Sequence, residues 1–348
     1  MLLKAKHRSA VAGLSVALVL IAVGWGWLAR QYSETWWWVA TIDLMPPQML
    51  MVAFAALAWA AWRERRLLWV LWNVVFAAAF LVLQVGLVVP LGRVAQAEAP
   101  PSALTLMTLN TWDAAAQASE LAGMARRQGA DIIALQEARK KNQDGSAYAA
   151  SLRAAFPGWT LVRQGELLTL SRLPIVKTSV VALQDSRHLL LVTRIQTDSG
   201  PLTVVNVHLP TLALLPRAQL PGDPKTLRER VKWRLGIRQA LPRALDSVQA
   251  DAAGPLVLAG DLNAPAWGEL HALLRQRGLQ DAFREAGSGF GFTFRAGLGF
   301  LRLDYVWGQD VRFIKTRALS DGVTSDHRVL LVRLALPAEP TTARHTRP

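Results

Sequence analysis

Residues 255–263 read PLVLAGDLN, an apolar run of strand length that ends in an aspartate and an asparagine. The same form, a short apolar run followed by polar residues, recurs at LTLMTLN (104–110), DIIALQE (131–137) and LTVVNVH (202–208). Short apolar runs of this kind are consistent with buried β-strands. Polar residues at the ends of neighbouring strands meet at one edge of a sheet, where binding sites often form. These runs therefore predict a sheet and a site at its edge.

Longer amphipathic stretches lie between the apolar runs. They have apolar residues at helical spacing and cover residues 114–129, 146–156, 224–250 and 266–278. Residues 159–196 instead contain consecutive strand-like runs with no helical stretch among them. Blocks of strands broken by a few helices favour an α+β sheet sandwich over a strictly alternating parallel sheet. We expect this domain to cover residues 103–336, followed by a short flexible tail, 337–348.

The composition differs between the two ends of the chain. Its 348 residues are 52% hydrophobic, yet 39 lysines and arginines stand against 25 aspartates and glutamates, a net charge of +14. Residues 1–93 hold few of these charges and nine of the 14 tryptophans. A collagen-like or disordered chain is excluded by this composition. The absence of cysteine excludes disulfides, thiolate metal ligands and a cysteine nucleophile.

Three apolar segments within residues 1–93 have the length of membrane spans, near residues 10–29, 44–62 and 67–91. A helix of about 20 residues matches a hydrocarbon core of about 30 Å. The first segment also fits a cleaved signal peptide, but no small-x-small cleavage site stands out after it. We expect the segment to be retained, so that residues 1–93 form a transmembrane anchor and residues 94–102 a tether.

Basic residues indicate how these spans are oriented. A basic cluster at residues 4–8 precedes the first segment, and RERR at 63–66 separates the second from the third. Positive charge is retained on the cytoplasmic side of a membrane. Both clusters are then cytoplasmic, and the large domain is exported whether or not the first segment is cleaved. We expect a multi-pass protein of the cell (inner) membrane with its large domain on the extracytoplasmic side.

Six short motifs follow one another in the large domain. They are TLN (108–110), LQE (135–137), NVH (206–208), GDLN (260–263), LDY (303–305) and SDH (325–327). Their order resembles that of the endonuclease/exonuclease/phosphatase superfamily, which includes deoxyribonuclease I, abasic-site endonucleases, neutral sphingomyelinases and inositol polyphosphate 5-phosphatases. The resemblance spans about residues 103–335. It implies a four-layered α/β sandwich with one metal-dependent phosphoesterase site.

The motif residues offer oxygen and imidazole ligands, a set that suits Mg²⁺ or Mn²⁺ at the carboxylates. The resemblance implies that Glu137 is the main Mg²⁺ ligand, with Asn110 and Asp326 as further ligands. One departure concerns the position two residues after the motif asparagine, where the abasic-site endonucleases carry an aspartate. This chain has Trp112 there.

The catalytic roles are also implied by the resemblance. His327, oriented by Asp304, would activate the attacking water or bind the scissile phosphate. The other motif residues would act around them: Asp261 and Asn263 position the water and hydrogen-bond the phosphoryl oxygens, and His208 protonates the leaving group or stabilises the transition state, with Asn206 in support. In each version of the mechanism, the site must stabilise the negative charge that develops on the phosphate and must remove a proton from the attacking water.

Two neighbouring stretches bear on the substrate. Residues 217–243 contain eight lysines and arginines, of which we expect Arg228 and Arg234 to contact the substrate. The basic stretch has three interpretations: contact with nucleic acid, attraction to anionic lipid headgroups, or a solvated helix face. The apolar loop LPTLALLPRAQLP (209–221) follows His208 directly and suits insertion into a bilayer or cover for an acyl or isoprenyl chain, or simply packs over the sheet edge.

Together these observations predict a membrane-anchored, Mg²⁺-dependent phosphoesterase that acts on a lipid-linked phosphate, pyrophosphate or phosphodiester. Its partners would be the lipid bilayer and a phosphorylated lipid, with no obligate protein partner. Confinement beside a bilayer raises the effective concentration of a lipid substrate. One alternative is an extracytoplasmic nuclease with a nucleic-acid partner, and another is a headgroup-binding module without catalysis.

Overall fold

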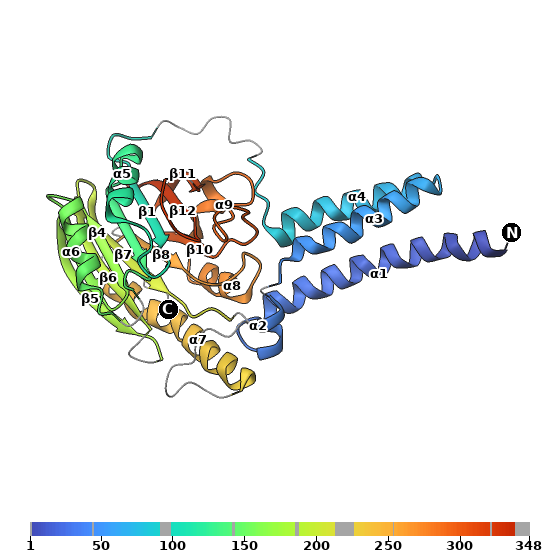
Figure 1. The fold of residues 1–348 in the computed structure, drawn as a ribbon, viewed down its shortest axis with the longest axis horizontal. Coiled ribbons are helices and arrows are strands. Elements are labelled where there is room, and N and C mark those ends of the chain that lie inside the picture. Colours follow the sequence, from blue (N-terminus) through green and yellow to red (C-terminus); the bar gives the residue numbers. More distant parts are fainter. Residues whose placement is uncertain are drawn as a thin grey trace, which may run out of the picture.

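The computed structural model of the chain describes residues 2–43, 45–90, 99–140, 143–184, 188–212, 226–252, 254–320 and 322–337. Two parts are distinct in Figure 1. Residues 2–90 form a set of extended helices, which we call the N-terminal helical unit. Residues 99–337 form a body of sheets and helices, which we call the sandwich domain.

Two six-stranded sheets make up the centre of the sandwich domain. The first contains β1 (Leu104–Asn110), β2 (Ile132–Gln136), β3 (Thr160–Gln164), β4 (Leu167–Ser171), β11 (Arg312–Leu319) and β12 (Val329–Ala335), in the order β11-β12-β1-β2-β4-β3. The second contains β5 (Ile175–Ala182), β6 (Leu189–Thr197), β7 (Gly200–His208), β8 (Leu256–Asp261), β9 (Gln280–Asp281) and β10 (Asp304–Gln309), in the order β5-β6-β7-β8-β10-β9. Both sheets are mixed, because β1 runs parallel to β2 and β7 runs parallel to β8.

Helices cover the outer face of each sheet (Figure 1). They are α5 (Ala118–Gln128) and α6 (Ser146–Ala155) on the first sheet, α7 (Leu227–Asp251) and α8 (Glu269–Gln276) on the second, and the short α9 (Ala282–Ala286). Three apolar layers result: one between α5, α6 and the first sheet, one between the sheets, and one between the second sheet and α7 and α8. The predicted four-layered α+β sandwich is confirmed.

The burial of the central strands explains why their sequences are continuous apolar runs. Every residue of β1, β2 and β8 is buried, because helices cover one face of each sheet and the other sheet covers the opposite face. The edge strand β5 is largely exposed and has a more polar sequence. The helix predicted at 224–250 begins at Leu227, where the Thr226 hydroxyl accepts a hydrogen bond from the Glu229 amide at 3.2 Å and caps it.

The N-terminal helical unit contains α1 (Leu2–Tyr32), α2 (Trp37–Asp43), the 3₁₀ turn η1 (Pro47–Met49), α3 (Leu50–Arg63), α4 (Leu67–Phe80) and the π-helical turn η2 (Leu81–Val85). Within the described part of the chain, two stretches are long and apolar enough to cross a membrane, Ala10–Tyr32 and Leu67–Val85. A third would be the pair formed by α2 with η1 and α3, which is bent by 63°. Two to three apolar helices are therefore present where three spans were predicted.

Details of this unit refine the prediction. The second apolar run, 44–62, belongs to the bent pair, and the helical part of the third, 67–91, ends at Val85, where Gly86 takes a φ of 86°. Asn73 donates from its side-chain amide to the Ser15 hydroxyl at 2.9 Å and links α4 to α1. Residues 94–98 of the predicted tether and residues 338–348 of the predicted tail lie outside the described residues.

The helical unit and the sandwich domain are in direct contact. Val88 and Gly289 exchange two backbone hydrogen bonds of 2.8 and 2.9 Å. Phe290 and Phe292 of the sandwich domain pack against the apolar cluster shared by α1, α3 and α4. The chain between α1 and α3 lies against α7 and α8, so the two parts form a continuous structure (Figure 1).

Candidate active site

The motif residues meet because of the strand directions. The parallel strands β1 and β2 end at the same edge of the first sheet, and β7 and β8 end at the same edge of the second. The antiparallel strand β10 begins at this edge, since Asp304 pairs with Asp261, which in turn pairs with His208. The strand β12 begins there too, two residues after His327. Six strand ends thus deliver polar side chains to one place.

Glu137 and Asn110 form one side of the site. The Asn110 amide nitrogen donates to Glu137 Oε1 at 3.2 Å and to Asp261 Oδ2 at 3.0 Å, so it joins carboxylates from both sheets. Glu137 Oε2 accepts from the Asp113 backbone N–H at 3.2 Å. Glu137 has a φ of 49°, and Trp112, Asp113 and Ala114 also have positive φ values. Left-handed backbone at non-glycine residues costs free energy and is found preferentially at functional sites.

His208 is held by a carboxylate that no motif contains. Its Nδ1 lies 2.8 Å from Oε1 of Glu166, which stands in the turn between β3 and β4. Its Nε2 points into the site, 3.8 Å from Glu137 Oε1 and 3.8 Å from Asp261 Oδ2. Burial alone would lower the pKa of His208, but the Glu166 carboxylate, followed by Asp261 and Glu137, raises it to about 9.

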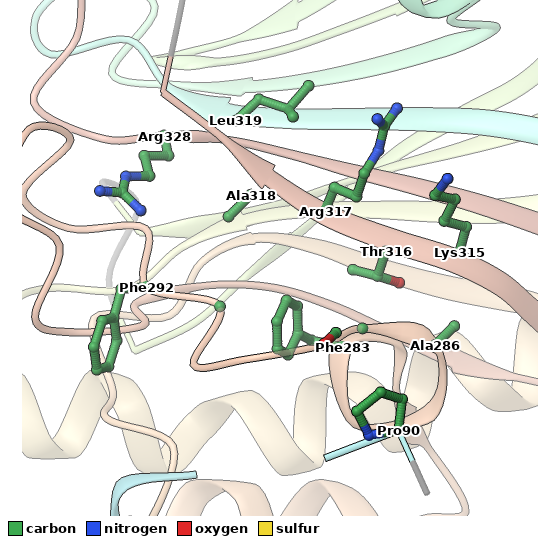
Figure 2. A pocket seen from close by; sticks show the side chains of 13 residues that line it. Pro90, Phe283, Ala286, Phe292, Lys315, Thr316, Arg317, Ala318, Leu319 and Arg328 are labelled. Carbon is green, nitrogen blue, oxygen red and sulfur yellow. The ribbon is translucent and has the colours of Figure 1, made fainter. Parts of the chain in front are cut away.

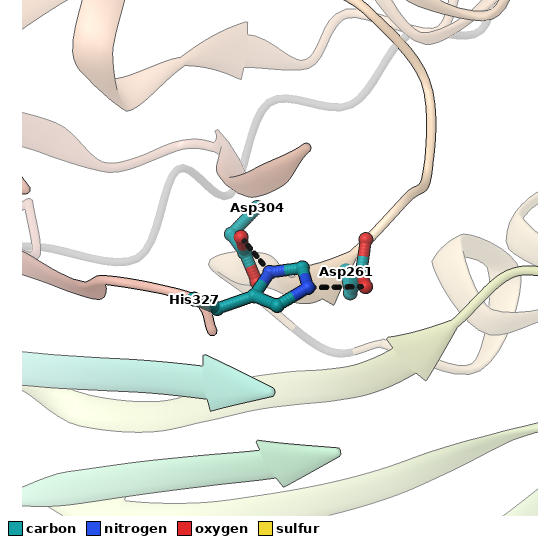
Figure 3. A group of neighbouring side chains, drawn as sticks. All are labelled: Asp261, Asp304 and His327. Atoms are coloured by element: carbon teal, nitrogen blue, oxygen red, sulfur yellow. Dashed lines mark hydrogen bonds and ion pairs between the residues drawn. The ribbon is translucent and has the colours of Figure 1, made fainter. Parts of the chain in front are cut away.

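His327 repeats this arrangement from the other side (Figure 3). Its Nδ1 lies 2.7 Å from Oδ2 of Asp304, and its Nε2 lies 3.8 Å from Asp261 Oδ2. Burial opposes protonation of this ring, but Asp304 and then Asp261 raise the pKa of His327 to about 10. Both imidazoles therefore have a carboxylate on Nδ1 and direct Nε2 at the same oxygen of Asp261.

Asp261 occupies the centre of the site and is almost completely buried. Its Oδ1 accepts from the Asn263 backbone N–H at 2.8 Å, and its Oδ2 accepts from the Asn263 side-chain amide at 3.2 Å. Asn263 has a φ of 46° and also donates to the Leu209 carbonyl at 2.9 Å. Burial and the Asp304 carboxylate raise the pKa of Asp261 to about 6, against the opposing effect of the two imidazoles.

The residues present fit a divalent cation. Asp261, Asp304 and His327 offer candidate ligand atoms that all lie within 4.8 Å of one another; because a protonated imidazole cannot coordinate a metal, the carboxylates are the ligands that this group supplies while His327 is cationic. Asp304 Oδ1 is buried and accepts no hydrogen bond from the described residues. A buried carboxylate oxygen without a partner is costly, so a ligand or cation is the natural complement. Glu137 and the partly exposed Asp326, whose Oδ1 lies 4.0 Å from His327 Nε2, add further carboxylates to this oxygen-rich set.

Three of the predicted site residues lie elsewhere. Asn206 is fully buried between the sheets, where its amide nitrogen donates to the carbonyls of Leu135 and Leu168 at 3.1 and 3.0 Å. Arg228 and Arg234 both lie on α7. The guanidinium of Arg228 is 6.0 Å from the centre of a Trp37 ring, and Arg234 donates to the Thr211 carbonyl at 2.8 Å. Their predicted substrate contacts stay predictions.

Sequence reasoning missed two carboxylates that bear on this site. Glu166 follows a glycine in the hairpin turn between β3 and β4, where the sequence gives no indication of a role in the site. Glu34 lies between two apolar segments and is one of the few acidic residues of the first 93. It forms a buried ion pair with Arg238 of α7, directly behind the loop that follows β8. Partners so distant in sequence become visible only in the folded chain.

A cavity of about 650 Å³ lies away from this cluster, between β11 and α9 (Figure 2). Phe283, Phe292 and Pro90 line one side of it, and Thr316 of β11 faces them. None of the site residues described above lines the cavity. The site chemistry is thus concentrated at the strand ends and not in this cavity.

Comparisons with known structures agree with the fold. An endonuclease/exonuclease/phosphatase from Beutenbergia cavernae is 22% identical and superimposes with a TM-score of 0.53 over 70% of this chain and 74% of that one. A family protein from Bacteroides thetaiotaomicron is 14% identical, with a TM-score of 0.53 over 71% of this chain and 100% of that one. A mannosyl-6-phosphatase from the same species is 14% identical, with a TM-score of 0.54 over 67% and 100%.

A comparison with curated protein sequences gives no match. The model of the Endonuclease/Exonuclease/phosphatase family matches residues 107–327, from the middle of β1 to His327. This region includes all the motifs and nearly the whole sandwich domain. The chain belongs to the endonuclease/exonuclease/phosphatase family and has the hydrolase fold of that family.

Proposed function

We propose that this protein is a membrane-anchored, Mg²⁺-dependent phosphoesterase that acts on a lipid-linked phosphate, pyrophosphate or phosphodiester at the outer face of the membrane. The observation that carries the proposal is the pair of carboxylate-bound imidazoles, whose Nε2 atoms both lie 3.8 Å from Asp261 Oδ2. Two oriented imidazoles around a buried carboxylate supply the proton donor and acceptor that phosphate-ester hydrolysis requires.

The different pKa values of Asp261, His208 and His327 indicate a different catalytic role for each. Asp261, with a pKa of about 6, can take a proton from water near neutral pH. His208, with a pKa of about 9, carries a proton that it can give to the leaving oxygen. His327 stays cationic beside Asp304 and meets the charge that develops on the phosphoryl oxygens. Asn263 adds a side-chain amide beside His208 Nε2, at 3.4 Å.

Glu137 would hold the metal ion, with Asn110 and Asp326 beside it. When bound, Mg²⁺ would neutralise charge on the phosphate and lower the pKa of a coordinated water. The network around Glu137 supports this assignment, because the Asn110 amide and the Asp113 N–H fix both of its carboxylate oxygens. A preorganised ligand binds a metal with less loss of conformational freedom.

The position of the helical unit supports a lipid substrate. Glu34 follows the apolar stretch Ala10–Tyr32 by two residues, and its partner Arg238 donates to the carbonyls of Leu262 and Asn263 at 2.8 and 3.3 Å. The ion pair of Glu34 and Arg238 therefore places the end of a candidate span close in space to the loop that carries Asn263. If that stretch spans a bilayer, the site lies close to the membrane surface, where a lipid-borne phosphate is concentrated.

The arrangement of the helices also supports export of the sandwich domain. The N-terminus and the turn between α3 and α4 lie at the end of the helical unit that is remote from the sandwich domain (Figure 1). Basic residues occur at both places, the cluster at 4–8 and the RERR sequence at 63–66. By the positive-inside rule that end is cytoplasmic, so the opposite end carries the sandwich domain outside.

The test is phosphate release by the full-length protein in detergent with Mg²⁺. Polyprenyl pyrophosphate, a phospholipid and duplex DNA are offered in parallel, and Glu137→Ala and His327→Ala are measured beside the unmodified chain. We expect turnover of a lipid substrate that both substitutions abolish. Cleavage of DNA alone would replace the proposal with the nuclease alternative, and the absence of metal-dependent turnover on all three would contradict it.

A further inference from the structure

A buried ion pair joins the helical unit to the sandwich domain. The Arg238 guanidinium donates from Nε to Glu34 Oε2 at 2.7 Å and from Nη2 to Glu34 Oε1 at 2.5 Å. Both side chains are almost completely buried, with 1% and 4% of their surface exposed. Gln239 adds a hydrogen bond from its side-chain amide to the Glu34 carbonyl. Glu34 therefore binds α7 with its side chain and its backbone.

The same guanidinium holds the loop that carries the catalytic residues. Arg238 Nη1 donates to the Leu262 carbonyl at 2.8 Å, with longer contacts to the carbonyls of Asn263 at 3.3 Å and Pro210 at 3.4 Å. Leu262 and Asn263 directly follow Asp261, and Pro210 lies two residues after His208. One side chain thus connects the helical unit to both segments that leave the second sheet at the site.

Further contacts fix the same loop farther along. The Glu34 N–H donates to Glu269 Oε2 at 2.9 Å, and the Glu269 N–H donates to the Ser33 hydroxyl at 2.9 Å. The Trp267 indole N–H donates to Asp43 Oδ1 at 2.6 Å. The segment from Leu262 to Glu269 is therefore held at its start by Arg238, which Glu34 binds, and at its end directly by residues of the helical unit.

The geometry makes Arg238 dependent on Glu34. A buried guanidinium needs a compensating charge, and a carboxylate that accepts two parallel hydrogen bonds fixes its plane as well as its charge. Once that plane is fixed, Nη1 is aimed at the loop carbonyls. Asn263 has a left-handed backbone, and its two amide groups bond Asp261, so a shift of this loop moves the centre of the site.

We infer that Glu34, a residue of the helical unit, is a positioning residue of the active site: through Arg238 it holds the backbone at Leu262 and Asn263 and thereby sets the geometry of Asp261 and Asn263. This inference rests on the proposed phosphoesterase activity at that site. It implies that the helical unit, besides anchoring the domain, completes the support of the catalytic loop.

The test uses the full-length protein with Glu34→Gln, which keeps the shape of the side chain and removes its charge. We expect kcat to fall about tenfold or more with little change in KM, since a small displacement of a catalytic group is costly. We also expect faster amide hydrogen exchange in the peptide that covers residues 262–268. Glu34→Asp keeps the charge, so its loss of kcat and its increase in hydrogen exchange should be smaller than those of Glu34→Gln. The same two measurements on Glu34→Asp replace those on Glu34→Gln if the latter does not fold.

A double-mutant cycle separates positioning from loss of stability. In the Asn263→Ala background, Glu34→Gln should reduce kcat by much less than in the unmodified chain, because both changes act through the same loop. The control is Asp131→Asn, which breaks another arginine–carboxylate pair, that of the buried Asp131 with Arg172. Its effect on hydrogen exchange should appear at the start of β1, where the Thr105 N–H donates to Asp131, and not at residues 262–268.

Two results would overturn the inference. The first is unchanged hydrogen exchange at residues 262–268 in Glu34→Gln. The second is a double variant, Glu34→Gln with Asn263→Ala, whose fold-loss of kcat equals the product of the two single fold-losses, because the two changes would then act independently. A full-length protein inactive on every phosphate ester would contradict the proposed function instead. Hydrogen exchange would then still decide whether Glu34 holds the loop.

Discussion

Asp261 Oδ2 is the point on which the two histidines converge, and each histidine owes its orientation to a different carboxylate. Asp304 belongs to a motif and lies beside Asp261 in the sheet, so the sequence could indicate its pairing with His327. Glu166 is 42 residues from His208 and stands in a turn, where a glutamate is usually solvated. The reactive residues could therefore be predicted, whereas one of the two groups that orient them could not.

The Glu166–His208 pair predicts a specific pH dependence of stability. The pKa of His208 is raised from 6.5 to about 9, so its stabilising effect is complete below pH 6.5 and is lost as the pH rises through about 9. The pKa of Glu166, which burial alone would raise, is lowered from 4.5 to about 2 by His208, so its effect is complete above pH 4.5 and is lost towards pH 2. The pair stabilises most between these limits.

We therefore expect Glu166→Gln to lower the unfolding temperature most between pH 4.5 and 6.5 and less at pH 9. The measurement is thermal unfolding of the chelator-treated protein across this range. The control is Asp246→Asn, which removes a surface ion pair with Arg277. An equal loss at all pH values would mean that Glu166 does not control the charge of His208.

Asp304→Asn tests the second histidine. The amide cannot stabilise a cationic imidazole as the carboxylate does, so the pKa of His327 should fall and kcat should drop by about 100-fold. Proton NMR of the histidine ring follows the pKa, and phosphate release follows kcat. A variant with unchanged kcat and a lowered pKa would show that the charge of His327 plays no part in turnover.

At the scale of elements, the strand ends of β7, β8 and β10 set the spacing of His208, Asp261 and Asp304. Their registers place these residues opposite one another, so a one-residue slip would disperse the site. The apolar runs predicted these strands because the strands are buried on both faces. The contacts of Glu34 with α7 and α8, and of Asp43 with Trp267, were not predictable in the same way, because they join residues far apart in the sequence.

The close approach of β8 to β7 requires a glycine at position 260. It has a φ of 149°, and a Cβ atom there would lie 1.9 Å from the Val207 carbonyl oxygen. Gly260→Ala should therefore lower the free energy of unfolding by about 1–3 kcal/mol and reduce activity through the adjacent Asp261. Chemical denaturation measures the first effect. Gly297→Ala, at a position with open space, is the control and should leave stability almost unchanged.

At the scale of the whole molecule, the apolar helices and the catalytic domain form one structure. The sequence indicated an anchor, a tether and a separate domain from their compositions. It could not indicate that Ser33, Glu34 and Asp43 contact the sandwich domain, because each of these contacts joins residues more than 200 positions apart. Such contacts are the route by which the helical unit would influence the site.

The proposed orientation in the membrane has a direct test, because the chain contains no cysteine. Thr178→Cys on the exposed edge strand β5 and Glu64→Cys in the turn between α3 and α4 are expressed separately in intact cells. A membrane-impermeant thiol reagent should label the first and not the second. Labelling of the second alone would place the sandwich domain in the cytoplasm.

The central claim is that the strand-end cluster is a metal-dependent phosphoesterase site. It is tested most directly by titrating Mg²⁺ into chelator-treated, full-length protein in lipid vesicles that contain polyprenyl pyrophosphate and measuring phosphate release. We predict release that rises with Mg²⁺ to saturation and is lost in Glu137→Ala and in His327→Ala, while Asp246→Asn retains it. Release that is independent of Mg²⁺, or that survives both substitutions at the site, would contradict the account.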